Sequence, residues 1–358
     1  MAKKYNFNPG PAVLPQEVLK KAQSELLDFN GTGLSIMEIS HRSKEFESVI
    51  NTAEAKVRTL LGVPANYSIL FLQGGASLQF SMVPMNLLKG GIADYIYTGE
   101  WSKKAIKEAK LNGTVHIAAS SEDSHFNSIP EIYSFSPEAA YVHLTSNETI
   151  GGIQWTRFPD TGKVPLIADM SSDIFSRAID VQKFGLIYAG AQKNLGPAGV
   201  TMVIIRNDLV EQSADNLPTI LSYKTHAKEK SLYNTPPCFA IYIVKLVLDW
   251  IESKGGLKAI EAANNEKAKL LYDMIDSTSF YRGTAAVPYR SKMNVTFRMG
   301  SEELEEKFIA EAKKGGFIGL KGHRSVGGCR ASIYNAMSLE GVRELVRFME
   351  KFAGENRG

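Results

Sequence analysis

Short apolar runs alternate with helical patterns along most of the chain. Runs rich in Ile, Leu, Val and Tyr predict buried strands over residues 68–72, 94–97, 115–118, 141–144, 166–168, 186–189 and 201–205. Helices are predicted from about Ser77 and over 101–110, where the second ends at Asn112-Gly113. Strands that alternate with helices indicate an α/β fold with a mostly parallel sheet.

The pattern changes at Gly255-Gly256. A long helix is predicted over 237–253, with proline at its start and glycine just beyond its end. The later segments predict a charged helix over 257–275, a half-exposed strand over 293–299, a helix over 301–314 with Ser301 as N-cap, short strands over 317–320 and 330–333, and a closing helix over 339–352. We therefore predict a large α/β domain over 16–255, and a smaller α+β domain made of 256–358 and the N-terminal segment 1–15.

Composition excludes several classes of protein. The 358 residues are 44% hydrophobic with a net charge of only +3, which excludes a mainly disordered chain. No run of Lys and Arg is longer than two, so nucleic acid is not an expected partner. The most apolar stretch, 241–251, contains Lys245 and Asp249 and is too short to span a membrane. With two cysteines, Cys238 and Cys329, and no signal-like apolar run at the start, we expect a soluble cytoplasmic protein without a membrane partner.

The most informative segment surrounds Lys193. This lysine follows directly on a predicted buried strand, and the residues around it are mostly Gly and Ala. Small residues let a planar ligand approach the backbone closely. A lysine amine that is partly removed from water can act as a nucleophile. A surface lysine on a glycine-rich loop is the alternative, and for this motif alone it is the better one.

Asp169 ends the predicted strand over 166–168. The carboxyl end of a strand faces the usual ligand crevice of an open α/β sheet, so this carboxylate could hold a protonated ring nitrogen. Taken alone, an ordinary turn or N-cap aspartate is the more frequent explanation. Asp169 and Lys193, however, follow successive predicted strands, and both can point into one pocket.

The segment Gln73–Ser77 lies between a predicted strand and a predicted helix. Backbone N–H groups at a helix N-terminus bind phosphate readily. The segment matches neither a P-loop nor a dinucleotide-binding motif, and taken alone it could be a simple tight turn.

Together these segments resemble the pyridoxal-phosphate enzymes of the aspartate-aminotransferase fold, and more narrowly the phosphoserine aminotransferases of class V, over nearly the whole chain. The segments that carry the resemblance are 6–12, 38–43, 74–80, 146–150, 169–172, 191–194, 233–237 and 322–328. Asn-Thr-Pro-Pro and Gly-His-Arg are specific, whereas Gly-Gly-Ala is not. Ser77 stands where many relatives have arginine, but its hydroxyl can still donate to a phosphate.

The resemblance implies pyridoxal 5'-phosphate as cofactor and a role for each matching residue. Lys193 would form the Schiff base with the cofactor aldehyde, and Asp169 would pair with the ring nitrogen. Trp101 would stack on the ring, and Thr149 would bond its phenolic oxygen. The cofactor phosphate would be met by Ala76, Ser77 and Gln192, and by Asn234 and Thr235 of a second subunit. The family thus implies a homodimer with shared sites, although Trp101 alone could be an ordinary aromatic and Asn234-Thr235 an N-cap.

The substrates would carry an α-carboxylate and a distal phosphate or carboxylate, which arginine binds bidentately. The matching positions are His41, Arg42, His323, Arg324 and Arg330. By resemblance, Arg330 takes the α-carboxylate and the others the distal anion, although each alone is more often a solvated charge. The implied reaction converts glutamate and 3-phosphohydroxypyruvate to 2-oxoglutarate and O-phosphoserine in serine biosynthesis. Whether 4-phosphohydroxythreonine, of vitamin B6 biosynthesis, is also a substrate stays open.

Two alternatives remain. A cysteine desulfurase of the same fold would use Cys329 as its sulfur carrier, but Cys329 precedes Arg330 at a predicted strand start, where a mobile exposed thiolate is not expected. A non-catalytic binding module is the other alternative, and the presence of both Lys193 and Asp169 argues against it. No metal site is predicted.

Overall fold

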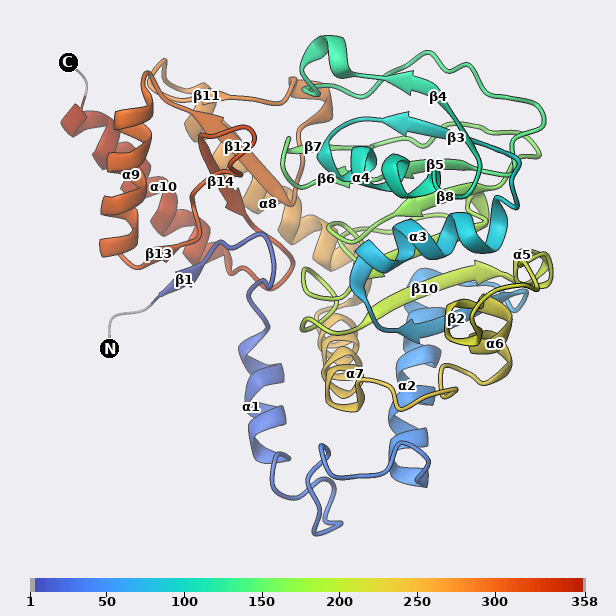
Figure 1. Cartoon of the computed structure of the whole chain (residues 1–358). Helices are drawn as coiled ribbons and strands as arrows, with labels where there is room; N and C mark the ends of the chain where they lie inside the picture. Colours follow the sequence, from blue (N-terminus) through green and yellow to red (C-terminus); the bar gives the residue numbers. More distant parts are fainter. Residues whose placement is uncertain (1–3, 357–358) are drawn as a thin grey trace.

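The computed structural model describes residues 4–356 (Figure 1). Within them, the main sheet has seven strands in the order β2-β10-β9-β8-β5-β3-β4. Their bounds are β2 Tyr67–Leu72, β3 Ile92–Tyr97, β4 Thr114–Ser120, β5 Val142–Thr145, β8 Leu166–Asp169, β9 Leu186–Gly190 and β10 Thr201–Arg206. Among these described strands, β10 runs antiparallel to both β2 and β9, and the other four pairings are parallel, so the predicted α/β fold with a mostly parallel sheet is confirmed.

Helices cover both faces of this sheet, which explains its continuous apolar strands. In β10, Met202 and Ile204 belong to the same hydrophobic cluster as helices α2 (Lys44–Leu61) and α7 (Cys238–Ser253). Val203 and Ile205 belong instead to the cluster that includes α3 (Gly75–Leu87) and α4 (Glu100–Ala109). The predicted start of α3 at about Ser77 was two residues late, because Gly74 already ends the preceding turn as the N-cap.

A second set of elements forms its own hydrophobic cluster around Phe297, Phe308 and Val342. Its elements are α8 Gly256–Asp276, β11 Arg282–Gly283, β12 Asn294–Arg298, α9 Glu302–Lys314, β13 Phe317–Ile318, β14 Cys329–Ser332 and α10 Leu339–Asn356. The N-terminal strand β1 (Tyr5–Asn6) pairs in parallel with β13, and Phe7 packs in this cluster. The start of α8 packs in the cluster of α2 and α7, and the domain division at residue 255 stays a prediction.

Strand β12 corrects one expectation. Residues 293–299 were expected to form a half-exposed strand, but Asn294–Phe297 are all buried. The polar face of β12 lies against the large sheet's part of the chain: Asn294 Oδ1 accepts from Asn147 Nδ2 at 2.8 Å, and Thr296 Oγ1 donates to the Gly151 carbonyl at 3.1 Å. The alternating polar residues of β12 therefore face an internal interface and not the solvent.

Shorter elements complete the chain. They are α1 Gln16–Ser24, β6 Asn147–Glu148, β7 Ile153–Gln154, α5 Asn207–Glu211, α6 Tyr223–Lys228, and 3₁₀ turns at Glu122–Ser124, Val181–Lys183, Thr219–Leu221 and Val287–Tyr289. In the part of the chain with described structure, no helix combines the length and the apolar character that crossing a membrane requires.

Candidate active site

Lys193 lies in the turn that follows β9. Its Nζ donates to Thr149 Oγ1 at 2.7 Å, and among the described residues it forms no ion pair. The pKa of Lys193 is lowered to about 8, mainly by burial and also by the nearby Arg330 charge, while Asp169 and Glu148 oppose the shift. A lowered pKa leaves more of the amine neutral near neutral pH, which is the state a nucleophile needs.

Asp169 ends β8, the strand that pairs with β9, and its side chain is buried with 4% exposure. Its Oδ1 accepts from the Ser171 amide at 2.9 Å and from Ser171 Oγ at 2.6 Å. No residue between 4 and 356 donates a hydrogen bond to Oδ2. Burial raises the pKa of Asp169, against the bonds from Ser171 and the charge of Lys193. A buried carboxylate with one free oxygen calls for a cationic or hydrogen-bonding ligand.

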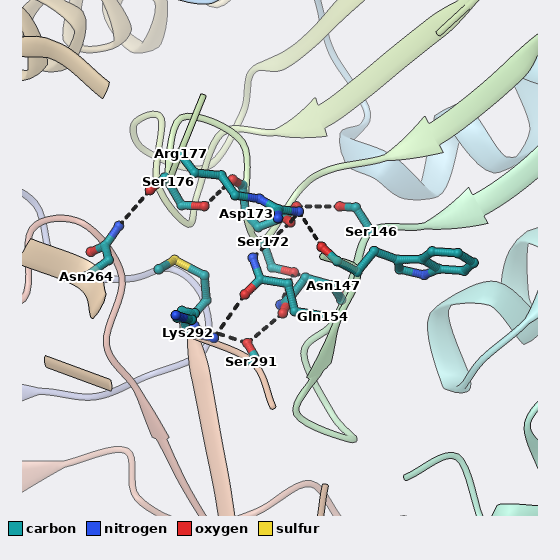
Figure 2. A network of polar contacts seen from close by, with 12 residues as sticks. Ser146, Asn147, Gln154, Ser172, Asp173, Ser176, Arg177, Asn264, Ser291 and Lys292 are labelled. Atoms are coloured by element: carbon teal, nitrogen blue, oxygen red, sulfur yellow. Dashed lines mark hydrogen bonds and ion pairs between the residues drawn. The ribbon is translucent and has the colours of Figure 1, made fainter. Parts of the chain in front are cut away.

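A buried polar network holds the turn after β8 (Figure 2). Asp173 accepts from Ser146 Oγ and from Gln154 Nε2, and Arg177 Nη2 lies 3.7 Å from its Oδ2. Ser146 Oγ also lies 3.0 Å from the backbone oxygen of Asp169. On the other side, Asn147 bonds Ser172 and Ser291. The turn that carries Asp169 is therefore fixed by buried hydrogen bonds on both sides.

Trp101 lies in the first turn of α4 and faces the same space as Lys193. Lys193 Nζ is 5.4 Å from the centroid of the Trp101 ring, and Lys104 Nζ is 4.3 Å from it. The backbone amide of Trp101 donates to Glu148 Oε2 at 3.2 Å. The structure thus brings Trp101, Lys193 and Thr149 together.

The N-terminus of α3 has free amides. Its N-cap is Gly74, at φ 86°, and no described side chain caps it, so the amides of Ala76 and Ser77 are available to an anion. A Cβ on Gly74 would lie 2.6 Å from Leu78 Cβ, and the positive φ also disfavours a side chain there. Gln73, just before this end, donates from Nε2 to the Thr235 carbonyl at 3.0 Å. Gln192 is half-buried next to Lys193, and its carbonyl accepts from the Ala12 amide.

Arg330, on β14, comes from the other part of the fold. It is 5% exposed, and its Nη1 donates to the Thr149 carbonyl at 3.2 Å, while its Nε is buried without a partner. Burial lowers the pKa of Arg330, and no acid in the described part of the chain pairs with it. A buried guanidinium with an unpaired N–H group calls for an anionic ligand.

His323 and Arg324 lie in the loop before β14. His323 is half-buried, its Nδ1 lies 2.7 Å from Ser325 Oγ, and Arg324 is exposed. Burial lowers the pKa of His323, and the charges of Arg330 and Arg324 lower it further. The lowered pKa favours a neutral His323 near pH 7, so the positive charge of this region comes from Arg330 and Arg324.

Within the described chain, no hydrogen bond or ion pair joins His41, Arg42, Asn234 or Thr235 to Lys193. His41 is half-buried with an unpartnered Nε2, and Arg42 is exposed. Asn234 is half-buried, and its Nδ2 donates to the Thr235 carbonyl at 3.3 Å.

Sequence reasoning assigned no role to Ser171 or Glu148. Ser171, two positions after Asp169, fits the local hydrogen-bonding pattern of an Asx turn, which was a usable signal. The sequence around Glu148 carries no such signal, because its hydrogen-bond partners, the Ser102 and Trp101 amides, lie 46 and 47 positions away. Cys329 is 2% exposed and burial raises the pKa of its thiol, the opposite of what a sulfur-carrying thiolate needs.

Comparison with known proteins identifies the family of this chain. The aminotransferase class-V family matches residues 4–345. The phosphoserine aminotransferase of Desulfosudis oleivorans is 61% identical over 355 residues, which are 98% of both chains, and that of Niallia circulans is 58% identical over 97% of both. The solved phosphoserine aminotransferase from Bacillus circulans subsp. alkalophilus has a TM-score of 0.98 at 58% identity, covering 99% of both chains.

A solved phosphoserine aminotransferase from Trichomonas vaginalis, described with PLP bound, has a TM-score of 0.93 at 41% identity and covers 97% of this chain and all of its own. The Thermus thermophilus aspartate aminotransferase, at 18% identity and a TM-score of 0.77, shares the fold. The chain therefore belongs to the class-V aminotransferases and, within them, to the phosphoserine aminotransferases.

Proposed function

We propose that this chain catalyses the reversible, pyridoxal-phosphate-dependent transfer of an amino group between glutamate and 3-phosphohydroxypyruvate, which gives 2-oxoglutarate and O-phosphoserine for serine biosynthesis. One observation carries the proposal: Asp169 ends β8, Lys193 lies just after the neighbouring strand β9, and Lys193 Nζ is held 2.7 Å from Thr149 Oγ1. The 61% identity to a phosphoserine aminotransferase supports the same reaction.

The residues present fit pyridoxal phosphate. Lys193 offers an amine with a lowered pKa to the aldehyde, and Asp169 offers a buried carboxylate with a free Oδ2 to a protonated ring nitrogen. Trp101 offers a ring face, and Thr149 a hydroxyl for the phenolic oxygen. The phosphate would be held by the free N-terminus of α3, at Ala76 and Ser77, together with Gln192.

When bound, the cofactor supplies an electron sink for the charge that develops at the substrate's α-carbon. Lys193 Nζ takes the proton from that carbon as a general base and later returns a proton as a general acid. The buried carboxylate of Asp169 keeps a proton on the ring nitrogen, because removing that proton would leave the carboxylate without a cation.

The basic residues suit a substrate with two anionic ends. Arg330, buried and with an unpaired Nε, would take the α-carboxylate that every amino-acid substrate carries. His323 and Arg324, in the exposed loop nearby, would take the distal phosphate or carboxylate, together with His41 and Arg42.

We propose a homodimer with shared sites. The segment that leads to His41 and Arg42 exposes Leu27 (85%), Leu34 (50%) and Met37 (60%), and an exposed apolar group of this kind favours a protein partner. A second copy that covers it could deliver His41, Arg42, Asn234 and Thr235 to the neighbouring site. We also propose that the enzyme is cytoplasmic.

Turnover with 2-oxoglutarate as acceptor tests the function. Phosphoserine, serine, alanine and aspartate are compared as amino donors at equal concentration, with 4-phosphohydroxythreonine as an added donor. We expect phosphoserine to be used far better than serine, because only phosphoserine engages the distal cations. Equal kcat/KM values for serine and phosphoserine would contradict the proposed substrate, and Lys193→Ala is the inactive control.

A further inference from the structure

Glu148 is a buried carboxylate that the reaction described above does not use. It is 1% exposed and lies on β6. The Trp101 amide donates to Oε2 at 3.2 Å and the Ser102 amide to Oε1 at 3.1 Å. Ser102 Oγ lies 2.9 Å from both Oε1 and the Gly99 carbonyl, and its single proton can go to either oxygen. These donors belong to the first turn of α4, so Glu148 caps that helix from a strand 46 positions further along the chain.

The local sequence of α4 leaves this capping place open. The N-cap residue is Gly99, which has no side chain to accept from the helix amides. A Cβ on Gly99 would lie 2.7 Å from Glu148 Cδ, so the missing side chain makes room for the carboxylate. Ser102 Oγ in turn accepts from the amides of Thr98 and Gly99 at 3.0 and 2.9 Å. The turn from Thr98 to Ser102 is therefore built around Glu148.

The amides of Trp101 and Ser102 can only donate to Glu148, which suits an ionised carboxylate. Burial raises the pKa of Glu148 to about 7, and the bonds from Ser102 and Trp101 oppose that shift. A negative charge at a helix N-terminus is also favourable, since that end of the helix carries a partial positive charge.

The next residue connects this cap to the reacting groups. Thr149 Oγ1 accepts from Lys193 Nζ at 2.7 Å, and the Thr149 carbonyl accepts from Arg330 Nη1 at 3.2 Å. Two consecutive residues thus connect the two parts of the site: Glu148 binds the Trp101 backbone, and Thr149 binds Lys193 and Arg330. A shift of Glu148 would change the position of the Trp101 ring relative to Lys193.

We propose that Glu148 is a positioning residue of this active site, which sets the place of the Trp101 ring by capping α4. The proposal rests on the proposed function only in assuming that Trp101 packs on the cofactor. Glu148 acts through the helix backbone and touches no substrate.

Trp101 fluorescence tests the proposal without substrate or turnover. The background carries Trp155→Phe and Trp250→Phe, so that Trp101 is the one tryptophan left in the chain. In cofactor-free protein, Glu148→Gln is compared with Glu108→Gln, the same change on the same helix away from its start. We expect faster acrylamide quenching of Trp101 in Glu148→Gln only.

The second readout is cofactor binding, followed by the quenching of Trp101 as pyridoxal phosphate is added. Glu148→Gln places an amide N–H group against helix donors, and we expect the Kd for the cofactor to rise about tenfold. If Glu148→Gln shows the same Trp101 quenching as Glu108→Gln, or the same Kd for the cofactor, the proposal is overturned. If Glu148→Gln does not fold, Ser102→Ala replaces it. We then expect smaller shifts in the quenching and in the Kd, and the absence of any shift would overturn the proposal. A failed phosphoserine assay with shifted Trp101 readouts would contradict the proposed function alone.

Discussion

Lys193 Nζ donates to Thr149 Oγ1 at 2.7 Å, so the amine is held by a neutral hydroxyl. A carboxylate in that place would favour the charged amine, whereas a hydroxyl does so only weakly. Burial therefore dominates, and the pKa of Lys193 falls from 10.5 to about 8. The position that fits the proposed catalysis also makes the ammonium form unfavourable in the folded protein.

This lowered pKa predicts a pH-dependent difference in stability. Below pH 8 the lysine is charged in both states, and the folded state carries the full cost of burying that charge. Between about pH 8 and 10.5 the unfolded chain binds more protons, so stability rises with pH. We expect cofactor-free wild type to gain free energy of unfolding relative to Lys193→Met over this range. Urea unfolding of both proteins at pH 7, 8, 9 and 10 measures it, and a constant difference would contradict the prediction.

Asp169→Asn should separate catalysis from cofactor binding. The amide can still bond a ring nitrogen, but it carries no charge to keep that nitrogen protonated. We expect kcat to fall by about 100-fold or more, while the cofactor content of the purified protein, measured by absorbance, stays near that of wild type.

Asp173→Asn is the matched control for Asp169→Asn. Asp173 is also buried, but it faces Ser146, Gln154 and Arg177. We expect Asp173→Asn to lower the melting temperature clearly. Its kcat should fall much less than the kcat of Asp169→Asn. An unchanged kcat in Asp169→Asn would remove Asp169 from its proposed role.

The basic residues should divide by which end of the substrate they bind. A hydrogen bond to a charged group contributes about 1.5–3 kcal/mol, so Arg42→Ala and Arg324→Ala should each weaken phosphoserine binding by about tenfold or more and change the cofactor Kd little. Arg330→Ala should weaken binding of every amino donor, because the α-carboxylate is common to all. Steady-state KM values for phosphoserine and alanine measure this. Equal losses on both donors in Arg324→Ala would show that Arg324 does not bind the phosphate.

Shared sites predict recovery of activity in mixed dimers. One chain carries Lys193→Ala, and the other carries Asn234→Ala with Thr235→Ala. In the mixed dimer one site collects every substitution, while the other combines an intact Lys193 with an intact Asn234-Thr235 pair.

We expect activity to reappear when the two impaired proteins are unfolded together and refolded, and each protein refolded alone is the control. No recovery in mixed dimers verified by differential tagging would contradict shared sites and leave the aminotransferase assignment intact.

Local patterns were enough to predict the strands of the main sheet and the helices α3, α4 and α7, but the sequence analysis did not predict α2. Strands covered on both faces are continuous apolar runs, so they stand out in the sequence. The N-cap of α9 was also local: Ser301 was predicted in that place, and its hydroxyl accepts from the Leu304 amide. Asp169 and Lys193 could be placed together because each lies at or just after the carboxyl end of a predicted strand, and parallel neighbours end at one edge of the sheet.

Tertiary structure alone decided the contacts between distant segments. The burial of β12, the bond from Arg330 to Thr149 across 181 positions and the capping of α4 by Glu148 all depend on which surfaces pack together. A hydrogen bond between residues far apart leaves no periodicity in the sequence, because each partner is compatible with many local environments. The amino-acid sequence by itself therefore determined the fold class and the chemistry of Lys193 and Asp169. Packing decided which groups hold Trp101, Lys193 and Arg330 in place.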